Sequence, residues 1–323
     1  MPRISVIIPV FNAAPTVDAT LKSALAQSFD DFEVIVVNDG STDTTAAVLE
    51  GHAGRIRVLD QENRGPAAAR NAGVRVSSGE YLAFLDGDDL WQPEMLAGTA
   101  QELSAAPHCA LVYGDLAVID GSGRQLSASL VGRKKAHAPT LDEMLRKLWP
   151  IMPSAALIRR SVFERCGGFC ERFRIARFED YYFFLRAREL GDFRFLPRRL
   201  GSWRFTGAPK PPNRAPGGGN YAQIFASLVE QRYGVSAKPL LSSWRRAARG
   251  AFSRAALLAL ASGDRRAART ALVKALRLDP RYVKTYSRLL KTLMPLSWLP
   301  FVSGRTAAGA PRPKPAAGAP RPV

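Results

Sequence analysis

Three carboxylates stand within four residues of one another directly after an apolar run, and their type and spacing suit divalent-metal chemistry. The run is Tyr81–Leu85, and the carboxylates that follow it are Asp86, Asp88 and Asp89. Like charges this close are unfavourable unless a cation lies between them. Mg²⁺ or Mn²⁺, held by one or two carboxylates together with substrate phosphates, would resolve the conflict. The cluster therefore predicts a divalent-metal site, and an exposed acidic turn without metal is the alternative.

One further polar residue follows an expected strand, and another lies in the helix expected after the next strand. Asp39 follows the apolar run Phe32–Val37, and Arg70 belongs to a helix expected at 65–77. Side chains at the carboxyl ends of neighbouring parallel strands meet at one edge of a sheet, which is where such sheets bind ligands. Asp39 and Arg70 could there bind a base and a phosphate. Asp39 could equally sit in a tight turn, and Arg70 could be a solvated helix charge.

Short β-branched runs alternate with amphipathic stretches over the first 120 residues. Strands are expected at 4–9, 32–37, 55–59, 81–85 and 110–118, and helices near 15–27, 43–52, 65–77 and 92–105. Further helices are expected near 140–148, 161–166, 179–190, 220–233, 240–262, 264–278 and 281–294. Alternating helices and nearly continuous apolar strands indicate an α/β fold, with a mostly parallel central sheet flanked by helices.

The order of the motifs along the chain resembles that of family 2 glycosyltransferases with the GT-A fold, a Rossmann-like α/β architecture. The resemblance covers about residues 3–207 and rests on four segments. They are Val6-Ile7-Ile8-Pro9-Val10-Phe11-Asn12, Asn38-Asp39-Gly40-Ser41-Thr42-Asp43, Arg70-Asn71-Ala72-Gly73 and Asp86-Gly87-Asp88-Asp89. The resemblance implies an inverting enzyme whose donor substrate is a nucleotide-diphospho-sugar.

The first two segments would then bind the nucleoside of the donor. The resemblance assigns Pro9, Phe11 and Asn12 to the nucleoside pocket. It also implies that Asp39 would hydrogen-bond uracil or another base. A uridine or thymidine base is favoured because its imide N–H needs an acceptor, so the donor is expected to be a UDP-sugar or a related nucleotide sugar.

The resemblance also implies how the diphosphate and the metal would be held. Arg70 would lie near the nucleotide, while Asp86 and Asp88 match the family's D-x-D motif. Both aspartates are expected in the metal site, the first near the ribose and the second on the Mg²⁺ or Mn²⁺ that bridges the diphosphate. Many relatives carry a histidine after the base helix, but this chain reads Trp203-Arg204-Phe205-Thr206 there. Arg204 is therefore expected to serve the diphosphate instead.

The second half of the chain would supply the acceptor side of the reaction. By the same resemblance, Asp180 matches the carboxylate that deprotonates the acceptor hydroxyl, and direct displacement would invert the anomeric configuration. Its neighbours Phe178, Tyr181 and Tyr182 are bulky, and apolar surroundings would raise the pKa of Asp180 towards a useful range. The alternative is that Glu179 and Asp180 form only the acidic first turn of a helix, favoured by the helix dipole.

The 323-residue chain carries a net charge of +18, and nearly all of that charge lies near its end. Residues 1–230 hold 27 Lys and Arg against 26 Asp and Glu, whereas residues 231–323 hold 19 against two. We therefore expect a catalytic domain over 1–210, a basic helical extension over 211–305 and a disordered Ala/Pro-rich tail over 306–323. Arginines interleaved with Trp and Leu suit an anionic membrane surface, and a helical cap on the catalytic domain is equally open. Nucleic-acid binding is disfavoured, because neither a groove-reading fold nor an aromatic platform is found.

Several other classes of protein fit the sequence poorly. No apolar run is long enough to predict a transmembrane helix, and the first residues lack a signal-peptide pattern. Three cysteines are too few for a disulfide framework. The expected location is the cytoplasm, with peripheral contact to the cytoplasmic face of the inner membrane as an option. The expected acceptor is a saccharide or lipid-linked hydroxyl in cell-surface polysaccharide or glycolipid synthesis. A non-catalytic protein that binds nucleotide sugars or an anionic membrane surface is the alternative.

Overall fold

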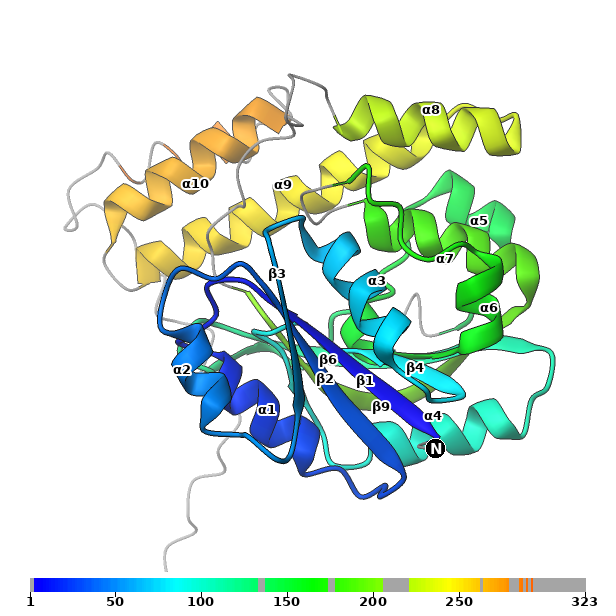
Figure 1. Cartoon of the computed structure of the whole chain (residues 1–323). Helices are drawn as coiled ribbons and strands as arrows, with labels where there is room; N and C mark the ends of the chain where they lie inside the picture. The colour runs from blue at the N-terminus through cyan, green and yellow to red at the C-terminus, as the bar shows by residue number, and fades with distance from the viewer. Residues whose placement is uncertain are drawn as a thin grey trace, which may run out of the picture. The chain divides into compact units, whose positions relative to one another are not determined.

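The computed structural model describes residues 3–132, 137–173, 178–205, 221–261 and 264–278, together with Thr285, Tyr286, Leu289 and Thr292. Figure 1 shows the course of the chain. The chain divides into two compact units, Met1–Ala247 and Ala248–Val323. All the motifs of the sequence analysis that could do chemistry lie in the first unit.

A sheet of nine strands runs through the described part of the first unit. Its strands are β1 (Ile4–Val10), β2 (Phe32–Asp39), β3 (Arg57–Gln61), β4 (Tyr81–Phe84), β5 (Leu90–Trp91), β6 (Cys109–Ile119), β7 (Gln125–Ser127), β8 (Ala156–Arg159) and β9 (Asp192–Arg204). Their order across the sheet is β3-β2-β1-β4-β8-β6-β9-β5, and β7 pairs with β6 off this path. The first four strands in this order run parallel, as do β6 and β9, whereas β8, β5 and β7 pair antiparallel with their neighbours. The expected α/β fold with a mostly parallel central sheet is confirmed.

The strands of the first half form where the apolar runs predict them. Ile4, Ile7 and Ile8 in β1 are fully buried, because helices cover both faces of the sheet. The register pairs Val10 of β1 with Asn38 of β2, so that the carboxyl ends of these two strands lie level. The polar residues that follow the strands are thereby brought to one edge of the sheet.

Four strands, β5, β7, β8 and β9, were not expected from the sequence. β8 has only four residues and follows a short 3₁₀ turn, Pro153–Ala155, so it is too brief to produce a periodic pattern. β9 carries several arginines and Pro197, and much of its length is exposed. It forms because it pairs along most of β6, from Cys109 with Asp192 to Ile119 with Arg204. Pairing with a distant strand outweighs a weak local preference in this case.

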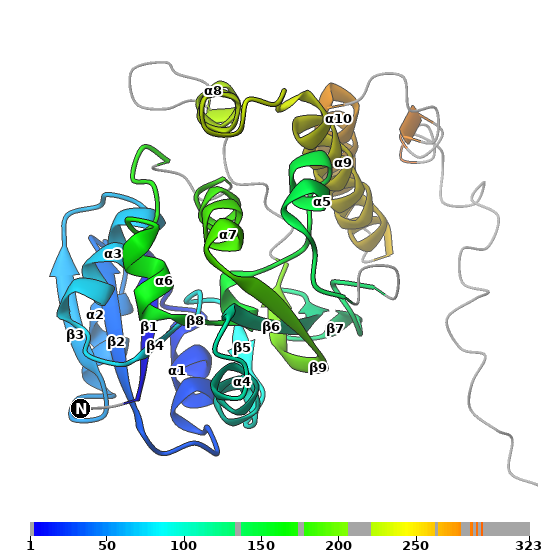
Figure 2. The ribbon, with the colours of Figure 1, turned by 90° about the vertical axis from the view of Figure 1, so that its right-hand side faces the viewer.

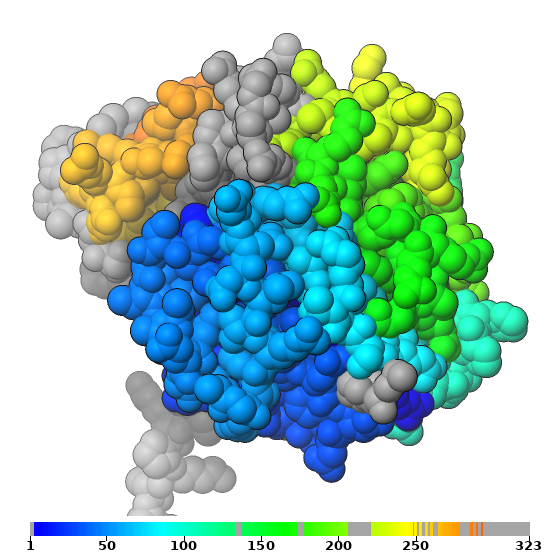
Figure 3. Space-filling view, viewed as in Figure 1, coloured from blue at the N-terminus to red at the C-terminus, as the bar shows by residue number. Residues whose placement is uncertain are grey.

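Helices cover both faces of the sheet. In the first unit they are α1 (Val17–Leu25), α2 (Thr45–Glu50), α3 (Pro66–Val76), α4 (Met95–Ser104), α5 (Leu141–Arg146), α6 (Arg160–Arg165), α7 (Glu179–Leu190), α8 (Tyr221–Tyr233) and the first part of α9 (Lys238–Ala261). α3, α5, α6 and α7 pack on one face of the sheet and α1 and α4 on the other, as Figure 2 shows. In Figure 3 the green segment that contains α6 and α7 lies directly beside the blue and cyan N-terminal residues. Segments far apart in sequence therefore share one face of the molecule.

The first unit reaches beyond the expected end of the catalytic domain at residue 210. Tyr221, Phe225 and Val229 of α8 are buried in the same apolar cluster as α7. The rings of Phe178 and Phe225 stack with their centroids 4.9 Å apart. Because these aromatic contacts join α8 to the core, the compact unit extends to Ala247. The expected Ala/Pro-rich tail, 306–323, lies outside the described residues.

The second unit is helical where the structure describes it, in the end of α9 and in α10 (Arg265–Leu278). The buried residues of α10 are Ala268, Ala271, Leu272 and Ala275. Its exposed residues include Arg266, Arg269 and Arg277, which makes the helix amphipathic with a basic outer face. Most of the helix expected at 281–294 lies outside the described residues. Among the helices that are described, none is both long and apolar enough to cross a membrane.

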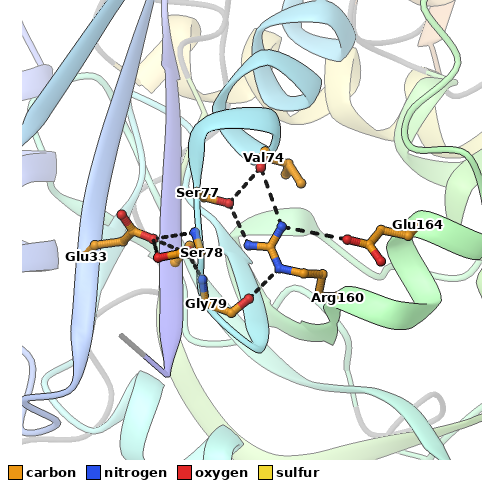
Figure 4. Close-up of polar contacts among 8 residues, drawn as sticks. Glu33, Val74, Ser77, Ser78, Gly79, Arg160 and Glu164 are labelled. Atoms are coloured by element: carbon orange, nitrogen blue, oxygen red, sulfur yellow. Dashed lines mark hydrogen bonds and ion pairs between the residues drawn. The ribbon is translucent and has the colours of Figure 1, made fainter. Parts of the chain in front are cut away.

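At the amino ends of the parallel strands, Arg160 ties α6 to the loop between α3 and β4 (Figure 4). Its Nε donates to the carbonyl oxygen of Gly79 at 2.5 Å, and its Nη2 donates to Ser77 Oγ at 2.7 Å. Glu33, near the start of β2, accepts the main-chain N–H of Ser78 at 2.8 Å. This network lies at the end of the strands opposite to the polar motifs. It anchors the carboxyl end of α3, the helix that carries Arg70.

We expect Gly79→Ala to destabilise the protein. A Cβ at this position would lie 2.5 Å from the main-chain nitrogen of Ser5 and 2.7 Å from the carbonyl carbon of Ile4. Main-chain atoms of a buried strand cannot move aside cheaply, so the free energy of unfolding should fall by about 1–3 kcal/mol. The measurement is the urea midpoint of unfolding.

Gly121→Ala is the matched control, because a Cβ on Gly121 meets no atom within 4 Å. Its urea midpoint should stay within error of wild type. An unchanged midpoint for Gly79→Ala would contradict the close approach of this loop to β1.

Candidate active site

The loops that leave β1 and β2 are joined by Asn12. This residue has a left-handed φ of 50°, a conformation that asparagine adopts more readily than most residues. Its Oδ1 accepts the main-chain N–H of Thr42 at 2.8 Å, and its own N–H donates to Ser41 Oγ at 3.0 Å. Asn12 is one of the residues expected in the nucleoside pocket. In the structure it holds the loops after β1 and β2 together at the carboxyl ends of these strands.

Phe11 presents an aromatic ring at the same edge. Its exposed fraction is 50%, whereas Pro9 beside it is half-buried in the strand. A large apolar ring this exposed gains free energy when a flat ligand covers it, and stacking on a nucleobase is one way to do so. The structure thus gives Phe11 the exposure that a stacking role requires.

The Asp39 carboxylate is held in place by three N–H donors of the protein. Its Oδ1 accepts from Gln61 Nε2 at 2.7 Å and from the main-chain N–H of Arg64 at 2.9 Å, and its Oδ2 accepts from the main-chain N–H of Gly65 at 2.8 Å. These bonds fix the loop that leads into α3. A carboxylate has about four acceptor positions, so one acceptor position of Asp39 is not used by these donors.

Arg70 is the buried centre of the site, with an exposed fraction of 2%. Its Nη2 donates to Asp86 Oδ1 at 2.6 Å, and its Nη1 donates to Glu179 Oε1 at 3.1 Å. The guanidinium also lies over the ring of Phe169, 5.3 Å from the centroid. Although burial alone would lower the pKa of Arg70, the charges of Asp86 and Glu179 raise it above its ordinary value. This cation draws the end of β4 and the start of α7 together.

Glu179 is a site residue to which sequence reasoning assigned no role beyond the first turn of a helix. Its exposed fraction is 1%. Glu179 lies in a mainly aromatic segment, Phe178–Leu185, which predicts a buried helix. Acidic residues are seldom buried unless a cation pairs with them, so this position could have indicated a buried ion pair. Its partner, Arg70, could not be identified from spacing alone.

The three clustered carboxylates lie in different environments. Asp86 and Asp88 are half-buried, but Asp89 is fully buried. Asp89 accepts from Ser154 Oγ at 2.6 Å and from the main-chain N–H of Arg204 at 2.9 Å. Burial, together with the charges of Asp86 and Asp88, raises the pKa of Asp89 well above its ordinary value. Asp89 is therefore held inside the protein by hydrogen bonds, and the expected metal ligands remain Asp86 and Asp88.

Arg204, expected on the diphosphate, holds main-chain carbonyl groups. Its Nε donates to the carbonyl oxygen of Asp88 at 2.8 Å. Its Nη1 donates to the carbonyl oxygens of Asp120 and Gly121, each at 3.1 Å. These bonds join the end of β9 to the acidic turn and to the turn after β6. Arg204 thus shapes the acidic turn, and a contact with the diphosphate stays a prediction.

Asp180 lies in the first turn of α7, next to Glu179. Its Oδ1 accepts the main-chain N–H of Tyr181 at 2.6 Å. The residue as a whole is half-buried, but protein surrounds its carboxyl group. Burial of that group, together with the charge of Glu179, raises the pKa of Asp180 to about 8. Arg70 opposes this shift, and Asp86 adds to it. The carboxyl group is therefore poised to exchange a proton near neutral pH.

The donor set at this edge fits a hard cation that protein and substrate hold jointly. Asp86 and Asp88 offer carboxylate oxygens, and one oxygen of Asp86 is engaged by Arg70. Within the described ranges, no group of three or more His, Cys, Asp and Glu is arranged to hold a metal alone. Mg²⁺ usually takes one or two carboxylates and completes its shell with phosphates and water, so a cage made only of protein is not required.

The sequence model of the family described as glycosyl transferase family 2 matches residues 5–167, from β1 to the end of α6. The chain belongs to this family. The matched segment contains Asp39, Arg70 and the Asp86–Asp89 turn, so the family expected from the motifs is confirmed. Asp180 and Arg204 lie beyond the matched segment.

Several glycosyltransferases are similar to this chain in sequence. EpsJ of Bacillus subtilis, an uncharacterized glycosyltransferase, is 31% identical over 215 residues, which are 63% of this chain and 61% of that protein. An uncharacterized glycosyltransferase of Haemophilus influenzae is 30% identical over 195 residues, 57% of this chain and 71% of that protein. Chondroitin synthase of Escherichia coli is 28% identical over 203 residues, 61% of this chain and 28% of that protein. For the first three curated relatives, the chain spans between 52% and 61% of their length.

A solved structure confirms the fold. Residues 1–349 of TarS from S. aureus, crystallised with UDP-GlcNAc, superpose on this family 2 chain with a TM-score of 0.53 at 17% identity. The likeness covers 90% of this chain and 89% of that chain. The expected GT-A architecture, a curled central sheet flanked by helices, is therefore what this glycosyltransferase-family chain adopts.

We expect Asp180→Asn to be more stable than wild type at high pH. The folded-state pKa of Asp180, about 8, lies above its ordinary value of 3.8, so ionisation of this group costs stability progressively as the pH rises between these values. Asparagine removes that cost. The difference in melting temperature between the variant and wild type should therefore grow between about pH 4 and about pH 8 and stay constant above that range.

Asp142→Asn is the control, because Asp142 is exposed and ion-paired with Arg146 on the surface of α5. Its melting-temperature difference from wild type should be small at every pH. A melting-temperature difference for Asp180→Asn that shrinks as the pH rises would contradict the burial of this carboxyl group near Glu179, Arg70 and Asp86.

Proposed function

We propose that this protein is an inverting glycosyltransferase that moves a sugar from a UDP-sugar to a hydroxyl group of a saccharide or lipid-linked acceptor. The observation that carries the proposal is the double contact of Arg70, with Asp86 of the acidic turn and with Glu179 beside Asp180. A turn suited to a nucleotide diphosphate and a candidate base are thereby held around one edge of the sheet. The complex of TarS with UDP-GlcNAc supports a uridine nucleotide as donor.

The donor would bind at the carboxyl ends of β1 and β2. The exposed ring of Phe11 suits one face of the base, and the Asp39 carboxylate, although only 3% exposed, would accept the imide N–H of uracil at the position that its three N–H donors leave. Because three N–H groups already orient the Asp39 carboxylate, little ordering is needed when the base binds. This arrangement favours uracil or thymine over bases that present only acceptors at that position.

Asp88, together with Asp86, would hold Mg²⁺ or Mn²⁺ next to the diphosphate. When bound, such an ion neutralises the negative charge that builds on the departing diphosphate. Arg70 adds a fixed positive charge behind Asp86, and Arg204 holds the Asp88 carbonyl group, so the acidic turn keeps its shape.

Asp180 would accept the proton of the acceptor hydroxyl. The oxygen of that hydroxyl forms a bond to the anomeric carbon of the donor sugar while the bond from that carbon to the diphosphate oxygen breaks. A single displacement of this kind inverts the anomeric configuration and needs no covalent intermediate. A pKa of about 8 for Asp180 suits the task, since a base is most effective when its pKa lies near the working pH.

The test is a screen of UDP-sugars with membrane extracts or oligosaccharides as acceptors, read as released UDP and as labelled product. We expect turnover that requires Mg²⁺ or Mn²⁺ and disappears in Asp88→Ala. We expect kcat in Asp180→Asn to fall by about 10²–10⁴, because general-base catalysis typically contributes this factor. Donor affinity in Asp180→Asn should stay close to wild type.

Asp142→Asn again serves as the control, and its kcat should equal that of wild type. Full turnover in Asp88→Ala would refute the metal assignment. Full turnover in Asp180→Asn would refute the assignment of the base while leaving the family untouched.

We further propose that the basic second unit contacts an anionic membrane surface, which would bring the enzyme to lipid-linked acceptors at the cytoplasmic face of the inner membrane. Support comes from the outer face of α10, where Arg266, Arg269 and Arg277 are exposed. Basic residues near an anionic leaflet contribute about 1 kcal/mol each. A role in the synthesis of cell-surface polysaccharide or glycolipid would follow from this location.

The membrane proposal predicts binding to vesicles that contain anionic lipid and not to neutral vesicles. Arg266→Gln/Arg277→Gln should bind anionic vesicles about 30-fold more weakly, since two residues at about 1 kcal/mol each give about 2 kcal/mol. The control is Arg124→Gln/Arg146→Gln, which removes two exposed arginines of the first unit that are already ion-paired. Equal loss in both double variants would show that net charge alone, not the second unit, directs binding.

A further inference from the structure

We infer that Glu179 is a positioning residue, which acts through Arg70 to hold Asp180 at a set place relative to the acidic turn. The inference rests on the proposed function, because it concerns the geometry of the proposed base. Glu179 itself would touch neither the donor nor the acceptor. Its task would be to fix the first turn of α7.

The contacts form an unbroken chain of charges across the site. Asp86 Oδ1 lies 2.6 Å from Arg70 Nη2, and Glu179 Oε1 lies 3.1 Å from Arg70 Nη1. The side chains of Arg70 and Glu179 are almost completely buried. A guanidinium suits this bridge because its N–H groups point in fixed directions in one plane, so two carboxylates on different sides are held at a defined separation.

Arg70 is itself well braced. The ring of Phe169 lies under its guanidinium. Asn71, the next residue of α3, binds both the carbonyl oxygen and the N–H of Phe169. Asn71 Nδ2 donates to the Phe169 carbonyl oxygen at 2.9 Å, and its Oδ1 accepts the Phe169 N–H at 2.9 Å. Because Arg70 cannot shift easily, the position of Glu179 is determined by the core of the first unit.

Glu179 is the first residue of α7, and Asp180 follows it directly. An acid that served only the helix dipole could remain in solvent, where it would still favour the amino end of the helix. Glu179 is buried instead and pairs with a cation 109 positions earlier in the chain. The pairing therefore tethers this end of α7 to α3 and, through Arg70, to the end of β4.

The test compares Glu179→Gln with wild type in the full-length protein, using the UDP-sugar that wild type turns over. Glutamine keeps the size of the side chain and one acceptor oxygen but removes the charge that holds Arg70. We expect kcat per folded active site to fall by about 10–100-fold, because small misplacement of a reacting group costs up to about 100-fold. The KM for the donor should change by less than about threefold.

Glu189→Gln is the matched control, because Glu189 lies in the last turn of the same helix and is ion-paired with Arg232 at 2.7 Å. It should keep the kcat of wild type even if its melting temperature falls. Glu179→Asp is a second variant, which retains the charge but withdraws the carboxylate by one methylene group. It should also lose kcat, and it secures the test if the glutamine variant does not fold.

The possible outcomes separate the two proposals. Loss of kcat at constant donor KM in both Glu179 variants, but not in Glu189→Gln, supports the positioning role. Wild-type kcat in a folded Glu179→Gln, when Asp180→Asn is inactive, overturns the positioning role and leaves the proposed function standing. Absence of turnover by wild type with every UDP-sugar overturns both.

Discussion

One buried cation organises the candidate site. Arg70 pairs with carboxylates 16 and 109 positions away in the chain, and Arg70 and Glu179 are both almost completely buried. Charges removed from water are tolerated only when opposite charges and hydrogen bonds replace the water. Arg70, Asp86 and Glu179 therefore depend on one another, and the Arg70–Glu179 pair fixes the start of α7 against α3.

Much of the first half of the fold could be predicted from the sequence. β1, β2 and β4 are buried on both faces, so each reads as a continuous apolar run, and the polar residue after each run marks where the strand ends. Asp39 and Asp86 could be placed at one edge of the sheet for this reason. Asp180 was placed by its likeness to a family motif, and the structure brings its helix to the same site.

The rest depends on contacts between distant segments, which local patterns do not contain. β9 forms because it pairs with β6, and α8 joins the first unit because its aromatic residues bury against α7. The acidic cluster shows the same limit. Spacing cannot distinguish Asp88, which reaches the surface in part, from Asp89, which turns inward to Ser154 and Arg204.

The buried side chain of Asp89 limits which segments of this fold can be exchanged between relatives. One buried carboxylate accepts from Ser154, before β8, and from the backbone of Arg204, at the end of β9. These two hydrogen bonds join the acidic turn after β4 to β8 and β9, next to the proposed donor site. A chimera that exchanges the second half between relatives must therefore also supply hydrogen-bond donors for this buried carboxylate.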